Sequence, residues 1–341
     1  MIRVSILGAT GYSGGELLQL LLSHPGVVIK HVTSRSSVGK AVSDIHPSLV
    51  KRSSLKFEKF DPSVVANDSD VIFSCLPATM GLKSTAQLVK QGKKVIDLSA
   101  DFRFPTAALF QTWYKEKHGA PHLLKSRVYG LPELFRNQIQ QSTLVANPGC
   151  YATAAILAAA PLIKPLIVDP HSLIVDAKSG VSGAGKKVDF QMTFCEVNES
   201  VKPYNVGSHR HQPEIESVLD SVGSSSVKVT FTPHLIPMNR GLLTVLYATL
   251  KKAIGIKDLR SLFIKAYEQE PFVRVLPEGV VPQTKHVRHT NYCDIGIFQD
   301  DRMRRAIIVA AIDNLGKGAA GQAVQNMNLL FGRSETEGLQ V

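Results

Sequence analysis

Cys150 is the residue best placed for chemistry in this sequence, because of the elements predicted on either side of it. The stretch Asn147-Pro148-Gly149-Cys150-Tyr151 follows an apolar run that predicts a buried strand over 143–146 and leads into an alanine-rich run that predicts a helix over 154–160. A thiol at the mouth of a helix meets free backbone N–H groups and the positive end of the helix dipole, which favour the nucleophilic thiolate. The alternative is that Cys150 packs as a small apolar residue at a strand-to-helix corner, as free cysteines commonly do.

A cysteine nucleophile needs a group that exchanges protons, and His209 is the candidate. It stands in the polar turn Gly207-Ser208-His209-Arg210-His211, just ahead of a helix predicted from near Pro213 to Val222. An imidazole titrates near neutral pH, so it can take up and return a proton. The sequence holds eleven histidines, so one histidine alone indicates little. The polar turn and the otherwise isolated cysteine single out His209.

A glycine-rich turn near the N-terminus predicts a dinucleotide site. The run 2–7 predicts a strand, the turn follows directly, and 16–22 predicts a helix, which is the context that gives a glycine motif weight. Gly8 permits a tight turn, Gly11 lets backbone N–H groups approach a pyrophosphate, and Gly14 allows close helix packing. The expected cofactor-binding residues of this turn are Gly8, Ala9, Thr10, Gly11, Tyr12, Ser13 and Gly14. A purely structural turn is the alternative.

The end of the second predicted strand, over 27–32, indicates NADP(H) as the cofactor. An NAD enzyme normally carries an acidic residue there for the ribose 2′-hydroxyl, and this sequence has none. It has Ser34, Arg35 and Ser36 instead, whose hydroxyl and guanidinium groups suit a 2′-phosphate. A solvated loop is the alternative interpretation of these residues.

Two further segments are candidates for binding an anion. Arg103 ends the stretch Asp97-Leu98-Ser99-Ala100-Asp101-Phe102-Arg103, which extends beyond a predicted strand over 95–98, where open α/β sheets bind ligands. It is either a phosphate clamp or a surface arginine paired with Asp101. The segment 178–186 is glycine-rich and basic, follows a predicted strand and ends on Lys186, so it is either an anion-binding loop or a flexible connector.

The order of elements predicts an α/β protein of two domains, since 341 residues exceed the usual size of one. The first part alternates strands with helices, as in a Rossmann-type doubly wound parallel sheet. After Cys150 strands dominate, as in an α+β domain built on a largely antiparallel sheet. We expect an NADP-binding domain over 1–149, a catalytic, substrate-binding and oligomerisation domain over 150–313, and a helix over 314–331 that completes the first domain. Residues 334–341 are expected to form a tail.

Composition and charge narrow the possible partners. A hydrophobic content of 44% with 20% charged residues is ordinary for a globular protein. The net charge of +11 suits a protein that handles phosphates, while the scattered lysines and arginines argue against a nucleic-acid site. No run predicts a membrane span or a signal peptide, so we expect a cytoplasmic protein. The four cysteines form no C-x-x-C pair, which argues against a metal site and a disulfide framework.

Five motifs in this order resemble the N-acetyl-gamma-glutamyl-phosphate reductases of arginine biosynthesis, from Gly8 to about Phe331. They are Gly8-Ala9-Thr10-Gly11-Tyr12-Ser13-Gly14-Gly15-Glu16, Asp97-Leu98-Ser99-Ala100-Asp101-Phe102-Arg103, Asn147-Pro148-Gly149-Cys150-Tyr151, His209-Arg210-His211 and Asp313-Asn314-Leu315-Gly316-Lys317-Gly318. Ala152 stands where many relatives have proline, and either residue suits a first helical turn. Other acyl-phosphate reductases, of carrier-bound aminoadipyl phosphate or of aspartyl phosphate, are alternatives within the same chemistry. A catalytically silent NADP-binding regulator is the alternative outside it.

The resemblance implies a small-molecule acyl phosphate, N-acetyl-L-glutamyl 5-phosphate, reduced with NADPH to the 5-semialdehyde through a thioester on Cys150. It implies that His209 is the acid–base residue and that the subunits form a homodimer or a homotetramer. Further cofactor contacts are expected at Ser182, Gly183 and Asn314. The expected substrate and phosphate contacts are Arg103, Asn147, Lys186, Arg210, His211 and Glu214.

Overall fold

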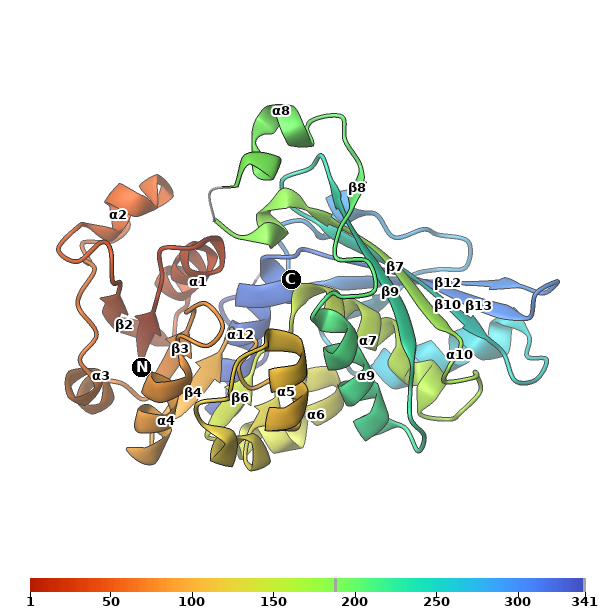
Figure 1. Ribbon diagram of the computed structural model, residues 1–341, viewed down its shortest axis with the longest axis horizontal. Helices are drawn as coiled ribbons and strands as arrows, with labels where there is room; N and C mark the ends of the chain where they lie inside the picture. The colour runs from red at the N-terminus through yellow and green to blue at the C-terminus, as the bar shows by residue number, and fades with distance from the viewer. Residues whose placement is uncertain (187–188, 340–341) are drawn as a thin grey trace. The chain divides into compact units, whose positions relative to one another are not determined.

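The computed structural model describes residues 1–186 and 189–339, and the chain forms two compact units (Figure 1). The first unit comprises Met1–Pro148 and the segment from Ala319 to the last described residue. The second unit is Gly149–Gly318, so it contains both Cys150 and Asn314. The chain crosses between the units directly before the predicted nucleophile.

The first unit is built on a six-stranded sheet in the order β2-β1-β3-β4-β6-β5. All of its neighbouring strands are parallel, which confirms the expected Rossmann-type sheet. Every residue of β3 is buried, as in a strand that is covered on both faces, where a continuous apolar run is needed. The strands are β1 Ile2–Leu7, β2 Val27–Thr33, β3 Val71–Ser74, β4 Lys94–Asp97, β5 Val128–Tyr129 and β6 Leu144–Ala146.

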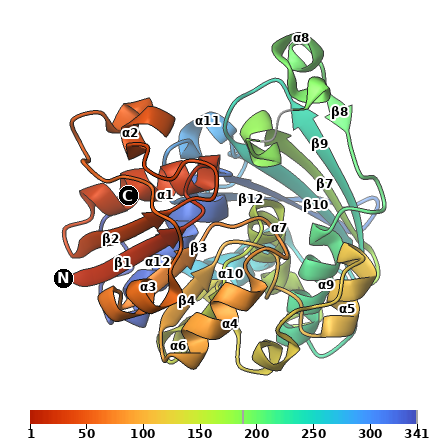
Figure 2. The ribbon, with the colours of Figure 1, turned by 60° about the vertical axis from the view of Figure 1, so that its left-hand side comes forward.

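Helices cover both faces of this sheet, with α4 in front of it and α12 behind it in Figure 2. The C-terminal helix α12 packs against α6 and α1, and all ten of its residues are buried. On the other face α3 packs against α4, and Asp61 caps α3 by accepting hydrogen bonds from the N–H groups of Ser63 and Val64. The helices of this unit are α1 Tyr12–Ser23, α2 Val42–Ile45, α3 Pro62–Asp68, α4 Leu82–Lys90, α5 Ala107–Tyr114, α6 Pro132–Gln140 and α12 Gly321–Leu330.

The second unit is built on a seven-stranded sheet in the order β11-β12-β13-β10-β7-β9-β8. Its pairings are antiparallel except for β11 with β12 and β7 with β9, so the sheet is mixed and mostly antiparallel, as expected. The long strand β12 carries several polar residues, and the sequence pattern alone does not predict it. The strands are β7 Leu173–Gly180, β8 Lys202–Pro203, β9 Val229–Ile236, β10 Leu242–Thr249, β11 Val273–Val275, β12 Cys293–Asp300 and β13 Arg305–Ile312.

The helix that begins at Cys150, α7, is the central helix of the second unit. It packs against α9, α10 and the strands β10 and β13, and all of its residues after Cys150 are buried. Residues of β10 alternate between buried and partly exposed, so the helices cover one face of the sheet and leave the other open. The helices of this unit are α7 Cys150–Ile163, α8 Phe194–Val197, α9 His211–Val222, α10 Ile256–Tyr267 and α11 Thr284–Val287. Among the described residues no helix is long and apolar enough to span a membrane.

The described part of the expected tail, 334–339, is fastened to the first unit. Arg136 donates a hydrogen bond to the Glu335 carboxylate at 2.7 Å, and Gln325 donates to the same carboxylate at 2.9 Å. Asn328 of α12 donates to the backbone carbonyl of Glu337 at 2.9 Å. The prediction of a tail is therefore wrong for these residues, because contacts distant in sequence hold them in place.

Candidate functional site

The turn that carries Cys150 is held by a buried carboxylate. Gly149 is the N-cap of α7, and its N–H donates a hydrogen bond to Glu214 Oε1 at 2.9 Å. Glu214 lies in the first turn of α9 and is only 1% exposed. On the helix side the Gly149 carbonyl accepts from the Thr153 N–H at 2.8 Å. Cys150 is therefore the first residue of a helix whose entry is fixed from both sides, and the helix N-terminus favours an anionic sulfur there.

Two glycines make room around the nucleophile. A Cβ on Gly149 would lie 2.2 Å from Nε2 of His211, so the imidazole packs directly on the turn. A Cβ on Gly318 would lie 2.8 Å from the Cβ of Cys150. Gly318 is remote in sequence, and only the Gly-Lys-Gly spacing at 316–318 hinted at a turn there. Glycine is therefore needed at positions 149 and 318, because His211 and Cys150 approach these two residues closely.

The two histidines ahead of α9 differ in their surroundings. His209 Nδ1 accepts a hydrogen bond from the His211 backbone N–H at 3.1 Å, so a neutral His209 ring carries its proton on Nε2. Burial, and next the charge of His211, lower the pKa of His209 to about 3. His209 is thus neutral at physiological pH and presents an N–H donor. His211 Nε2 lies 4.0 Å from Glu214 Oε2, which links this ring to the carboxylate that holds Gly149.

Tyr151, the residue after the nucleophile, supports both imidazoles. Its ring meets His209 edge to face with a centroid distance of 5.7 Å and meets His211 at 5.9 Å. The Tyr151 hydroxyl donates to the His234 carbonyl at 3.1 Å and accepts from the Tyr204 hydroxyl at 3.3 Å. Burial raises the pKa of both phenols, so they remain protonated. Tyr151 is therefore a packing residue that fixes the positions of the two rings.

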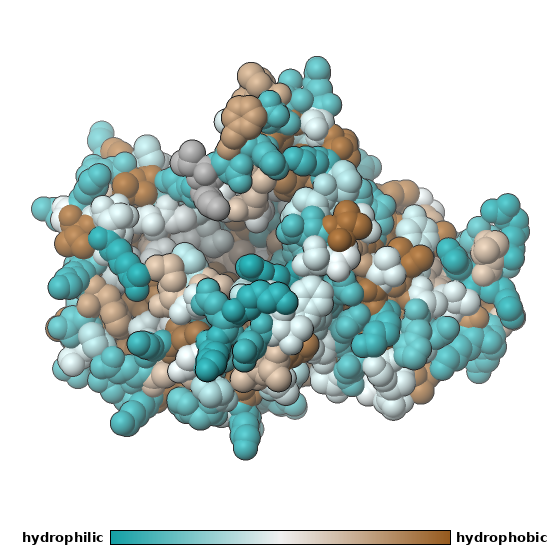
Figure 3. Space-filling model, in the orientation of Figure 1, coloured by the Kyte–Doolittle hydropathy of each residue, from teal (hydrophilic) through white to brown (hydrophobic). Residues whose placement is uncertain are grey.

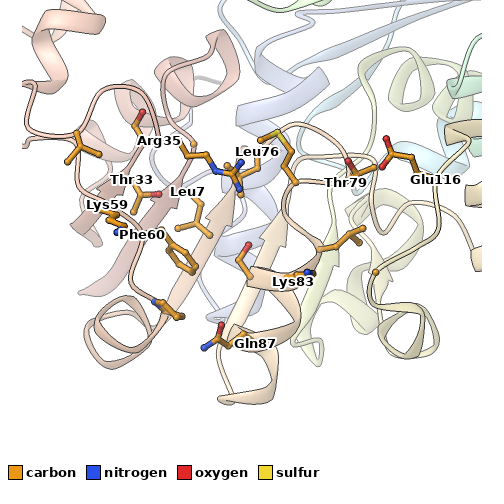
Figure 4. A pocket seen from close by; sticks show the side chains of 18 of the residues that line it. Leu7, Thr33, Arg35, Lys59, Phe60, Leu76, Thr79, Lys83, Gln87 and Glu116 are labelled. Carbon is orange, nitrogen blue, oxygen red and sulfur yellow. The ribbon is translucent and has the colours of Figure 1, made fainter.

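A cavity of about 890 Å³ opens in the first unit at the carboxyl ends of β1, β2 and β3 (Figure 4). This is the sheet edge at which doubly wound folds bind dinucleotides. One end is lined by Gly8, Thr33, Ser34, Arg35, Lys59 and Phe60. Leu76, Thr79, Met80, Lys83 and Glu116 line the remainder. The structure thus brings three predicted cofactor residues, Gly8, Ser34 and Arg35, to one cavity.

The glycine turn beside this cavity has the geometry that a pyrophosphate needs. Gly8 has a φ of +78°, which favours glycine, and a Cβ there would lie 2.8 Å from Leu76 Cδ2. A Cβ on Gly14 would lie 2.6 Å from the Ala9 Cα, so α1 packs tightly on the turn. Around Gly11, the N-cap of α1, no heavy atom lies within 4 Å of the Cβ position. The helix N-terminus is therefore open on this side to an anionic group.

The loop after β2 is ordered by Ser34. The Ser34 hydroxyl oxygen accepts from the N–H groups of Ser36 at 3.3 Å and Ser37 at 3.2 Å, and the Ser34 N–H donates to the Glu58 carbonyl at 3.0 Å. The segment after Glu58 runs beside the end of β2, which brings Lys59 to the cavity that Arg35 also lines. Lys59 and Lys83 are cationic lining residues that sequence reasoning missed, because no motif marks them.

Arg103 and Asn147 meet at the end of the parallel sheet. Arg103 is 8% exposed, so it is not the surface arginine of the alternative interpretation. Its Nε donates to the Asn147 carbonyl at 2.8 Å and its Nη2 donates to the Leu98 carbonyl at 2.8 Å. The Asn147 side chain donates to the Ala319 carbonyl at 3.0 Å and accepts from Asn326 Nδ2 at 3.0 Å. These contacts anchor the backbone that leads toward Cys150.

Ser182, Gly183 and Asn314 come together in the second unit. Asn314 Nδ2 donates to the Ser182 hydroxyl at 2.9 Å, and Asn314 Oδ1 accepts from the Gly241 N–H at 2.8 Å. A Cβ on Gly183 would lie 3.7 Å from Asn314 Nδ2. Both the nitrogen and the oxygen of the Asn314 amide therefore bond within the second unit. Lys186 and Arg210 are both exposed.

The chain matches known proteins over its full length. Residues 3–142 match the family model described as the NAD binding domain of semialdehyde dehydrogenase, and residues 150–314 match the semialdehyde dehydrogenase dimerisation domain. A curated N-acetyl-gamma-glutamyl-phosphate reductase of Halothermothrix orenii is 48% identical over 341 residues, covering 100% of this chain and 98% of that protein. The protein of the same name from Geobacter sp. strain M21 is 49% identical over 342 residues, covering 100% and 99%.

Solved structures show the same fold. Aspartate semialdehyde dehydrogenase II of Vibrio cholerae superposes with a TM-score of 0.74 at 17% identity, covering 97% of this chain and 99% of that one. The enzyme of Candida albicans, solved with NADP, gives 0.73 at 18% identity, covering 97% and 99%. The solved structures confirm the expected two-domain fold, and the family models and curated relatives confirm an oxidoreductase with a nicotinamide dinucleotide as cofactor. On its identity to curated relatives over the whole chain, this protein belongs to the N-acetyl-gamma-glutamyl-phosphate reductase family.

Proposed function

We propose that this protein reduces N-acetyl-L-glutamyl 5-phosphate with NADPH to N-acetyl-L-glutamate 5-semialdehyde and phosphate, in L-arginine biosynthesis. The observation that carries the proposal is the Cys150 turn, where a half-buried thiol begins α7 and Glu214 holds the preceding N–H. The curated relatives are named as reductases of this acyl phosphate.

In the first step the Cys150 sulfur attacks the acyl carbon. A carbon–sulfur bond forms, the bond from that carbon to the phosphate oxygen breaks, and phosphate leaves with the bonding electrons. The N–H groups in the first turn of α7 stabilise the oxyanion formed during the attack. The product is a thioester, whose carbon remains electrophilic enough for reduction, whereas a carboxylate would not.

The residues around the cavity of the first unit fit an NADPH molecule. The open N-terminus of α1 behind Gly8 and Gly11 would hold the pyrophosphate, and Ser34, Arg35 and Ser36 would hold the 2′-phosphate. The proposal extends to Ala9, Thr10, Tyr12, Ser13 and Gly14 of the same turn and to Ser182, Gly183 and Asn314. When bound, NADPH supplies the hydride that reduces the acyl carbon.

His209 acts on the oxyanion that follows reduction. Its Nδ1 is occupied by the His211 N–H, so its Nε2–H is the group that can donate to the oxyanion and stabilise it. A neutral imidazole is a suitable donor for this purpose because it brings no charge that must be removed when the intermediate collapses. On collapse the carbon–sulfur bond breaks, the aldehyde leaves, and the thiolate is restored.

Several polar residues would bind the substrate and its phosphate. Lys186 and Arg210 are exposed cations that can neutralise a leaving phosphate. His211 lies against the Cys150 turn and would orient the substrate there, while Glu214 would act on the substrate through the turn that it holds. Arg103 and Asn147 are further proposed substrate contacts, and the arginine fixes the Asn147 backbone.

The reverse reaction tests the proposal directly. We expect phosphate-dependent reduction of NADP with N-acetyl-L-glutamate 5-semialdehyde, and much slower turnover with aspartate semialdehyde or an aminoadipate semialdehyde. Cys150→Ser is expected to lower kcat by about a thousandfold or more, because a serine hydroxyl is a far weaker nucleophile at neutral pH. Cys195→Ser, at an exposed cysteine of α8, is the matched control and should keep full activity. Wild-type turnover by Cys150→Ser would rule out the covalent mechanism.

The second unit also supports the expectation of a homodimer or homotetramer. Its sheet leaves one face open, on which Ile174 and Tyr247 line a shallow cavity with Asp176 and Arg305. Apolar side chains are exposed around α8 as well, where Phe190 is 73% and Phe194 is 78% exposed (Figure 3). Sedimentation velocity of the wild type and of Tyr247→Glu tests the open face, since a dissociated variant would place the interface there. A cytoplasmic location stays a prediction.

A further inference from the structure

The turn between β3 and α4 forms part of the dinucleotide cavity in an unusual backbone conformation. Thr79 and Met80 of this turn line the cavity. Thr79 has a φ of +71°, in the left-handed region that a β-branched residue rarely adopts. Such a conformation costs free energy and persists only when neighbouring groups hold it. The group that holds Thr79 is therefore a candidate determinant of the cavity shape.

Asp101 is the group that holds Thr79 in this conformation. Its Oδ1 accepts a hydrogen bond from the Thr79 N–H at 2.6 Å, across 22 residues of sequence. Asp101 is 0% exposed, and its Oδ2 has no hydrogen-bond partner among the described residues. A Cβ on Gly81 would lie 3.7 Å from Oδ2, at van der Waals contact, so the turn packs against the carboxylate.

The same residue also fastens a second segment of the cavity wall. His118 Nε2 donates to the backbone carbonyl of Asp101 at 2.7 Å, while His118 Nδ1 accepts from the Ala120 N–H at 3.1 Å. Glu116 and Gly119, on either side of this contact, line the cavity. Figure 4 shows Thr79 and Glu116 at the same end of the cavity. Asp101 thus binds two separate wall segments, one through its side chain and one through its backbone.

We propose that Asp101 is a positioning residue for the dinucleotide, because it holds the Thr79 turn and the segment around Glu116 in the shape that contacts the cofactor. This inference rests on the proposed function only in placing NADPH in this cavity. Asp101 does not itself line the cavity, so it acts through Thr79 and His118.

The strength of the hydrogen bond from Thr79 depends on the protonation state of Asp101. Burial, and next the charge of Asp97, raise the pKa of Asp101 to about 7. The groups around it are Asp97 and Ser99 of its own turn, Arg103, and His118, whose pKa burial lowers so that it stays neutral. An ionised carboxylate accepts the Thr79 N–H more strongly than a neutral carboxyl group does. The Thr79 turn is therefore held best above the pKa of Asp101.

The test is the dissociation constant of NADPH, measured by its fluorescence with the full-length protein between about pH 6 and about pH 9. We expect Asp101→Asn to weaken binding about fivefold at the alkaline end, and to converge with the wild type at the acid end. The titration of the cofactor's own phosphate is common to both proteins and cancels in the comparison. Asp70→Asn, at the opposite edge of the same sheet, is the matched control and should follow the wild type.

A second pair of variants separates backbone strain from loss of a side chain. Thr79→Gly removes the cost of the left-handed conformation and should restore most of the affinity that Asp101→Asn loses, whereas Thr79→Ala should restore none. If Asp101→Asn does not fold, Thr79→Gly alone should flatten the pH dependence relative to Thr79→Ala. Equal affinities of Asp101→Asn and the wild type at alkaline pH, or equal rescue by glycine and alanine, would overturn the proposal. A wild type that does not bind NADPH would instead overturn the proposed function.

Discussion

The Cys150 turn and the dinucleotide cavity are built on opposite principles. At the Cys150 turn, one short motif is packed closely, with Glu214 bonded to Gly149 on one side and Gly318 against Cys150 on the other. At the cavity, lining residues from Leu7 to Gly119 leave a space of about 890 Å³. A nucleophile must be held to a fraction of an ångström, whereas a large ligand needs room and several weak contacts. We therefore expect turnover to be sensitive to atoms added at the Cys150 turn, and cofactor affinity to be sensitive to charges removed from the cavity.

Among the changes that test this comparison, the largest effect is expected from adding one methyl group beside the nucleophile. In Gly318→Ala the new Cβ would lie 2.8 Å from the Cys150 Cβ, and one of the two must move. We expect kcat to fall about a hundredfold, the usual cost of misplacing a reacting group by about 1 Å. Gly255→Ala, at a second-unit glycine with no backbone neighbour within 3.4 Å of the Cβ position, is the control and should keep its activity. Steady-state kinetics that show an unchanged kcat for Gly318→Ala would contradict the close packing of this turn.

The second-largest effect is expected from changing the carboxylate that accepts the hydrogen bond from the turn. In Glu214→Gln an amide oxygen can still accept the Gly149 N–H, but without the charge that strengthens this bond and faces His211. We expect kcat to fall about tenfold while KM changes little, because the loss concerns the position of the nucleophile. Glu216→Gln, two residues along α9, is the control. A rise in KM alone would place Glu214 in substrate binding instead.

The third effect tests the charges of the cavity. Lys59→Ala removes a cation from the cavity that Arg35 also lines, so we expect NADPH to bind about fivefold more weakly and NADH to be unaffected. Lys56→Ala, at an exposed lysine outside the cavity, is the matched control. The ratio of dissociation constants for the two cofactors is the measurement. An equal loss for NADPH and NADH would show that Lys59 does not contact the 2′-phosphate.

The smallest effect is on stability and depends on pH. Burial tends to lower the pKa of His31, but its hydrogen bonds with Glu58 at 2.7 Å and Asp68 at 3.0 Å outweigh burial and raise it above 6.5. A raised pKa contributes stability that is fully present below the unfolded value and is lost as the pH rises through the folded value. We expect His31→Gln to lower the free energy of unfolding by about 0.5 kcal/mol in mild acid and by less in mild alkali. Urea denaturation at the two pH values measures the difference, and an equal loss at both would contradict it.

Much of the fold and part of the site followed from local patterns. The strand, glycine turn and helix over 2–23 were predictable because each depends on residues that are close together in the sequence. An apolar run indicates the strand, and Gly8, which has a positive φ, indicates the turn that follows it. The same holds for the helix that begins at Cys150. The strand β12 was missed because its polar residues interrupt the apolar pattern, and its place beside β13 depends on a partner distant in sequence.

The sequence by itself determined where a nucleophile and a dinucleotide turn stand along the chain, because strand, turn and helix signals are short in range. Only the tertiary structure decided what surrounds them: Glu214 on Gly149, Gly318 on Cys150, and Asp101 on Thr79. It also showed that the Asn314 amide, predicted to face the cofactor, bonds to Ser182 and Gly241. Each of these contacts joins residues far apart in sequence. Neither periodicity nor a motif predicts which distant residues will be in contact. Packing within each unit sets those distances, and the chemistry depends on them.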